Sequence, residues 1–220
     1  MAIFTDLDPQ PNLSELGFDR SLIRQSSNPM EDNPSMKNLF LAGSGLGDRQ
    51  MFVDARSNVY AGNNAGVFPV NPLGENCFIV GKTNFVNVVN GSNNVAIGID
   101  CLRLNTTGES NIAVGKNVLS SNTTGTQNVA FGYQALTSNM LGAANIAIGY
   151  KALLNSNGGR NIAIGALALD SNITGHSNIA IGYSADVGSG ALMNAIAIGV
   201  RSSVAASNTC RIGGTTGTGN

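Results

Sequence analysis

Charged residues are scarce in this chain. Only 11% of its 220 residues are charged, and 12 Lys and Arg nearly balance 13 Asp and Glu, for a net charge of -1. An ordinary globular domain carries about 25%. Disordered chains rely on high charge, so we expect a folded protein despite the 28 glycines. Binding to DNA or RNA needs clustered Lys and Arg, and the sequence has no such cluster, so we expect no nucleic-acid partner.

Long apolar runs are also missing. No stretch approaches the roughly 20 residues that span a bilayer, so we expect no membrane insertion. The residues from Met1 to Asp6 show no basic region followed by an apolar one. We therefore expect no secretion signal and folding in a cytoplasm.

Residues that carry chemistry are few and scattered. Cys77, Cys101 and Cys210 lie far apart without CxxC spacing, which predicts buried, reduced, apolar side chains. His176 is the only histidine and lies in a turn, where exposure to solvent is expected rather than catalysis or zinc binding. The repeats described below show no paired acids. We predict that the protein is not an enzyme and has no cofactor or metal.

What the sequence does contain is a repeat, which is marked by regularly spaced glycines. The position number rises by 17 from one glycine to the next, except by 16 between Gly149 and Gly165 and by 14 between Gly199 and Gly213. Self-similarity at a fixed period is the signature of repeat architectures. The glycines are Gly81, Gly98, Gly115, Gly132, Gly149, Gly165, Gly182, Gly199 and Gly213.

Each of these glycines closes a pentapeptide that alternates between two residue classes. Asn-Ile-Ala-Ile-Gly occurs at 145–149, 161–165 and 178–182, with close variants in the other repeats. Alternation with a period of two is typical of a β-strand. In most repeats a leucine lies at the fourth position after the glycine, and then comes a turn rich in Asn, Thr and Gly, such as 105–108.

A repeat of this length has room for two short strands and two tight corners, but not for a packed pair of helices. Such coils stack about 4.8 Å apart, so the repeats would form a rod roughly 38 Å long. We therefore predict an all-β fold, a parallel β-roll or β-solenoid over residues 76–213. The sequons at Asn105, Asn122 and Asn172 are interpreted as corner residues.

The alternation also gives each strand two faces. We predict that the isoleucines form the core together with the leucine row, at Ile146, Ile148, Ile162, Ile164, Ile179 and Ile181. The opposite face would carry a hydrogen-bonded amide ladder of Asn94, Asn111, Asn128, Asn145, Asn161 and Asn178. Alanines and the glycines Gly98, Gly115, Gly132, Gly149, Gly165 and Gly182 would leave a smooth surface there for another chain.

The segment 1–75 differs from the repeats. All six prolines lie there, and proline removes a donor from a strand ladder. We predict an extended docking segment at 1–35 with a short helix near 16–24, transition strands at 36–75, and a tail at 214–220. The docking segment holds a sparse apolar set, Phe4, Leu13, Leu16, Phe18, Leu22 and Ile23, of the kind that orders on a partner.

The in-phase Asn-Ile-Ala-Ile-Gly run resembles the head repeats of trimeric autotransporter adhesins and related repeats in phage tail fibres and other phage surface proteins. The resemblance covers roughly residues 76–213. It implies a left-handed parallel β-roll in which three chains form one rod. The repeat is longer than is usual in the bacterial adhesins, and neither a signal peptide nor a membrane anchor is recognisable. The resemblance therefore favours a virion protein.

The expected function is that of a structural virion protein, a homotrimeric tail fibre or spike on the virion surface. Its partners would be its own copies, other virion proteins through residues 1–35, and a host-surface glycan or protein. A capsid decoration or cement protein is the alternative. A bacterial surface adhesin is less favoured, as is a glycan-cleaving spike.

Overall fold

The protein is described from a computed structural model, which covers residues 51–53, 57–62, 74–84 and 91–214. The predicted docking segment at 1–35, with its apolar set and short helix, lies outside the described residues. So does most of the predicted transition at 36–75. Among the described residues every regular element is a strand.

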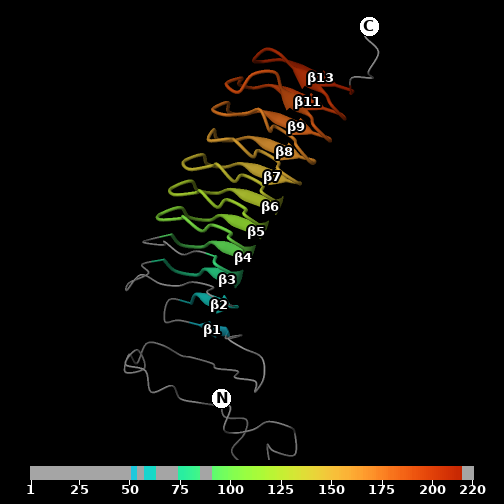
Figure 1. Cartoon of the computed structure of the whole chain (residues 1–220). Coiled ribbons are helices and arrows are strands. Elements are labelled where there is room, and N and C mark those ends of the chain that lie inside the picture. The colour runs from blue at the N-terminus through green and yellow to red at the C-terminus, as the bar shows by residue number, and fades with distance from the viewer. Residues whose placement is uncertain (1–50, 54–56, 63–73, 85–90, 215–220) are drawn as a thin grey trace, which may run out of the picture.

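Figure 1 shows the described coils stacked into a rod, with one strand of a continuous sheet in each coil. Only the first pair, β1 with β2, is antiparallel, and each later strand pairs in parallel with the strand of the next coil. The predicted parallel β-solenoid is confirmed, and its coils keep the period of the sequence repeat. The strands of this sheet are β1 (Met51–Val53), β2 (Val59–Ala61), β3 (Phe78–Lys82), β4 (Val95–Ile99), β5 (Ile112–Lys116), β6 (Val129–Tyr133), β7 (Ile146–Ile148), β8 (Ile162–Ile164), β9 (Ile179–Ile181), β11 (Ile196–Ile198) and β13 (Cys210–Ile212).

Equivalent residues of successive coils lie directly above one another. Ala96 pairs with Ala113, and Gly98 pairs with Gly115. Gly98 has a φ of 132°, and a Cβ at this position would collide with the backbone carbonyl of Gly115. Glycine ends each pentapeptide because only a residue without a side chain turns the chain this way under another coil.

The second side of each coil differs from the prediction of a second strand. Strands occur on this side only at β10 (Asp186–Val187) and β12 (Ser203–Val204), which pair in parallel. Elsewhere in the described coils it consists of turns, and leucines adopt left-handed backbone angles, as at Leu136 with a φ of 52°. Such a conformation costs about 1–2 kcal/mol, whereas burying a leucine contributes about 1.5–3 kcal/mol. The free energy gained by burying the leucine therefore outweighs the cost of its left-handed backbone conformation.

From β4 to β11 the interior of the coils is narrow and is filled mainly by alanine, leucine and asparagine, whereas β2 and β3 carry Tyr60 and Ile79 at the inward position. Ala147, Ala163 and Ala180 are fully buried, as are Leu153 and Leu169. In the strand row, alanine faces inward in every coil from β4 to β11. The predicted leucine row thus lies in the core.

The prediction that the isoleucines fill the core does not hold for this chain. Their side chains point outward, and Ile148, Ile164 and Ile181 are 40%, 38% and 37% exposed. Ile146, Ile162 and Ile179 are half-buried on the same outer face. The alternation is as predicted, but the two faces are exchanged, because from β4 to β11 the inner row is packed with alanine. Larger inward side chains occur in β2 and β3, at Tyr60 and Ile79. The smooth alanine surface predicted for contact with other chains is therefore inside the coil.

Substitutions at two neighbouring alanines test this placement. Ala163 is fully buried, so Ala163→Leu should overpack the coil and destabilise it by about 1–3 kcal/mol. Ala166 is half-buried in a row that holds Tyr150 and Tyr183 in adjacent coils, so Ala166→Leu should be tolerated. Chemical denaturation followed by circular dichroism measures both. Equal stability of the two variants would contradict the assignment of the inner face.

Candidate functional site

The most prominent surface feature is a strip of apolar side chains along the outside of the sheet, here called the apolar face. It consists of three outward positions in each coil, two before the repeat glycine and one directly after it. One row holds Val95, Ile112, Val129, Ile146, Ile162, Ile179 and Ile196. The second holds Ile97, Val114, Phe131, Ile148, Ile164, Ile181 and Ile198. The third holds Ile99, Lys116, Tyr133, Tyr150, Ala166, Tyr183 and Val200.

The apolar face is continuous because the coils stack in register. Six steps of about 4.8 Å from Ile97 to Ile198 make it about 29 Å long. Phe131, Tyr150 and Val200 are 39%, 47% and 58% exposed. Single soluble chains rarely expose connected apolar areas of more than a few hundred Å², and larger ones mark contact with another molecule.

Aromatic contacts order the third row of the apolar face. The rings of Tyr133 and Tyr150 stack with their centroids 5.6 Å apart and their planes 9° from parallel. The Lys151 ammonium lies 5.2 Å from the centroid of the Tyr150 ring. These contacts hold the tyrosines along the rod in the spacing that the coils impose.

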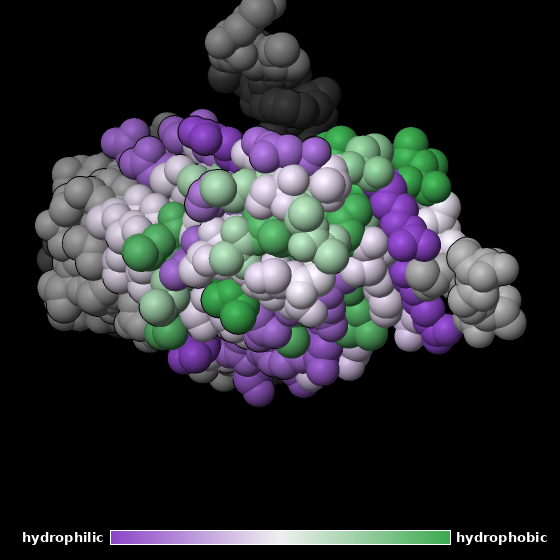
Figure 2. All heavy atoms as spheres, turned by 90° about the horizontal axis from the view of Figure 1, so that it is seen from above, coloured by the Kyte–Doolittle hydropathy of each residue, from purple (hydrophilic) through white to green (hydrophobic). Residues whose placement is uncertain are grey.

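Polar residues lie on other parts of the circumference, together with a few exposed apolar side chains outside the sheet, namely Met140, Leu141, Ile173 and Met193. The turn side of the coil carries Ser121, Ser138 and Asn155 at its surface. Figure 2 looks along the stack and shows hydrophilic residues gathered on some stretches of the rim and hydrophobic residues on others. The outside of the rod is therefore amphipathic, with its apolar side on the sheet.

Inside the coil, the asparagine that opens each pentapeptide connects successive coils. The Asn111 backbone nitrogen donates to Asn94 Oδ1 at 2.9 Å, and Asn111 Nδ2 donates to the Gly125 carbonyl at 2.9 Å. Asn128 and Asn145 repeat the pattern, with Nδ2 also donating to the Oδ1 of the preceding asparagine. The six predicted ladder asparagines are fully buried. Each satisfies groups of two coils that water does not reach.

A second buried asparagine row follows the leucines and includes the three sequons. Asn105, Asn122 and Asn172 are fully buried, so their amide nitrogens face the interior. Asn122 Nδ2 donates to Asn105 Oδ1 at 2.7 Å and to the Gly125 carbonyl at 3.0 Å. These bonds fix the corner.

The second row is interrupted in the coil that is one residue short. Ser156 stands where other coils have asparagine, and Asn139 Oδ1 is left buried without a hydrogen-bond partner. The missing residue is compensated by Asn157, whose Oδ1 accepts from the backbone nitrogens of Met140 and Leu141 at 3.0 and 2.8 Å. In the coil below, the Met140 carbonyl accepts the equivalent bonds.

Removing one amide tests the first ladder. Asn145→Ala should leave the Asn161 backbone nitrogen and the Gly158 carbonyl without their partner, because Asn145 bonds to both at 2.9 and 2.8 Å. Each unsatisfied buried group costs about 1–3 kcal/mol. Asn155→Ala is the control, because Asn155 is exposed. Thermal unfolding should show a clear loss for the first variant and little change for the second. Equal effects would contradict a structural role for the inner amides.

The cysteines divide into two kinds. Cys77 and Cys101 are buried, and burial raises the pKa of the Cys101 thiol to about 11, which keeps it protonated and unreactive. Cys210 is exposed on β13, so the prediction of burial is wrong for this residue.

His176 is exposed, as its turn predicted. In the described ranges no three His, Cys, Asp or Glu residues gather as a metal site would require.

Sequence reasoning missed a pair of acids. Asp186 lies close to Asp170 of the preceding coil, and burial, followed by weaker repulsion from Asp170, raises the pKa of Asp186 to about 6 despite hydrogen bonds from Ser171 and the Val187 backbone. Asp186 stands at the leucine position, where Val187 replaces the leucine in the core. An aspartate in place of the repeated leucine is the sequence signal from which this pair could have been found.

Comparison with known proteins found no matching family model, curated protein or solved structure. Within the part of the chain that the structure describes, no helix has the length and apolarity to cross a membrane. The fold and the apolar face therefore carry the functional argument.

Proposed function

We propose that the protein is a structural rod that assembles lengthwise with copies of itself. The apolar face carries this proposal. It runs along the whole repeat region, and its main rows contain no charged residue, so the matching surface must also be apolar and straight. The same face on another copy has both properties, and symmetric self-association is the commonest way to cover such a surface.

The proposed assembly is a homotrimer at the surface of a bacteriophage particle, where it serves as a fibre or spike and contributes to host attachment. The number of chains and the virion setting are supported by the Asn-Ile-Ala-Ile-Gly resemblance. The stack is suited to hold a host-binding surface at a fixed distance from the particle, because successive coils are bonded to each other through backbone and amide groups. Three chains would present each outer residue three times, which raises avidity for a repeated surface.

A charge on the apolar face tests the assembly. Ile164→Asp places a carboxylate in the centre of the second row, where association would bury it without a partner. Sedimentation equilibrium should give a trimer for the wild type and a monomer for the variant, with an unchanged strand signal in circular dichroism. Ser138→Asp, on the exposed polar side, should remain trimeric. A monomeric wild type, or a fully trimeric Ile164→Asp protein, would refute the proposal.

Attachment is proposed to lie in residues 1–35, with the roll projecting outward. A chain that begins at Met36 should still trimerise and melt cooperatively, because the stacked coils are intact. It should fail to join particles when it replaces the full chain during infection. Normal incorporation of the shortened chain would place attachment in the roll instead.

A further inference from the structure

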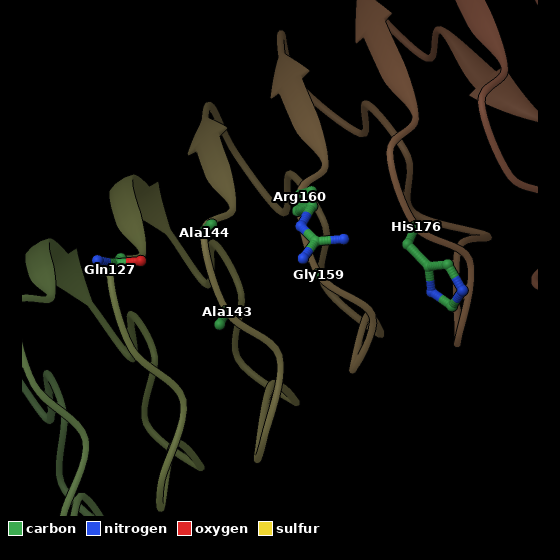
Figure 3. A pocket seen from close by; sticks show the side chains of 6 residues that line it. All are labelled: Gln127, Ala143, Ala144, Gly159, Arg160 and His176. Atoms are coloured by element: carbon green, nitrogen blue, oxygen red, sulfur yellow. The ribbon is translucent and has the colours of Figure 1, made fainter.

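A hollow of about 390 Å³ opens on the outer surface where the short coil lies. Figure 3 shows its lining residues, which come from the bends that precede the strands of four successive coils. They are Gln127, Ala143, Ala144, Gly159, Arg160 and His176. The volume falls within the range of small-molecule sites, about 300–1,000 Å³.

The hollow arises from small residues between longer ones. Ala143 and Ala144 stand where the preceding coil has Thr126 and Gln127, and where the second coil after them has His176 and Ser177. Gly159 cannot be larger, because a Cβ there would lie 2.8 Å from the Ala143 carbonyl oxygen. The floor is therefore a patch of methyl groups and backbone, with long polar side chains on either side along the rod.

The backbone groups on the floor of the hollow are already hydrogen-bonded, whereas the Arg160 and His176 side chains beside it are not bonded to any described residue. The floor backbone is engaged between coils, since the Arg160 nitrogen donates to the Ala143 carbonyl at 2.8 Å and the Ala144 nitrogen to Thr126 at 2.9 Å. The Arg160 and His176 side chains have no hydrogen bond or ion pair to any residue that the structure describes. No acid lines the hollow. A ligand would therefore meet an unpaired guanidinium, an imidazole and the Gln127 amide.

We propose that this hollow binds the carboxylate of an acidic sugar residue in a surface polysaccharide, which rests on the proposed role in host attachment. A guanidinium pairs with a carboxylate through two parallel hydrogen bonds. The apolar face of a sugar ring fits against the alanine floor, and Gln127 offers both a donor and an acceptor for ring hydroxyls. Arg160 precedes Ile162 by two residues on the outer side, so the hollow borders the apolar face and occurs three times in the proposed trimer.

The test is calorimetric titration of the full chain with a glucuronate-containing oligosaccharide, its carboxyl-reduced neutral counterpart and inorganic phosphate. The acidic oligosaccharide should bind, and the neutral one should bind several-fold more weakly or not at all, because it has no carboxylate to pair with the Arg160 guanidinium. Arg160→Gln should cause a similar loss. Ala144→Met should fill the hollow and abolish binding, whereas Arg103→Gln, outside the hollow, should not change it.

The inference would be overturned if the acidic oligosaccharide did not bind, if its neutral counterpart bound equally well, or if Arg160→Gln bound like the wild type. Phosphate binding as tightly as the oligosaccharide would also overturn it, because the hollow would then be a general anion site. Sedimentation of the same samples separates the two proposals. A trimer that does not bind refutes only the hollow, whereas a monomer that binds refutes only the assembly.

Discussion

The hydrogen bonding between successive coils is the constraint on which the rest of this structure depends. Parallel strands must lie about 4.8 Å apart, so every residue has its own equivalent as its neighbour above and below. A position then accepts only residue types that tolerate a copy of themselves at that distance. Glycine at the turn and alanine in the strand meet this condition on the inside, and asparagine meets it because its amide both donates and accepts.

A narrow interior has a further effect on where apolar side chains lie. From β4 to β11 the inward strand position holds alanine opposite the second side of the coil, so the β-branched residues of these strands lie on the other face. They line the outside instead, in rows that the stacking makes straight. Backbone and amide hydrogen bonds join each coil to the next, while much of the hydrophobic surface remains for contact with another molecule.

The sequence was sufficient to predict the strand period, the stacking and the inward leucines, because each depends on local spacing. It did not reveal which strand face lies inside. Hydrophobicity favours burial of Ile164 over Ala163, but that rule assumes that one chain covers its own apolar surface. The left-handed backbone conformation of Leu136 could not be predicted from the sequence either, because burial of the side chain imposes it against the local preference of leucine. The hollow beside Arg160 and the Asp170–Asp186 pair depend on residues from different coils, where the repeat is irregular.

The short coil shows which part of the repeat is free to vary. Between Gly149 and Gly165 one residue is lost, yet Ile148 still pairs with Ile164, and the whole change is absorbed at the corner where Asn157 replaces a backbone carbonyl. Length at that corner is therefore independent of the sheet. One coil therefore differs from its neighbours in the length and chemistry of that corner, while the register of the sheet along the rod continues through it. The distance between coils is thus set by the sheet, and the corner can differ without changing that distance.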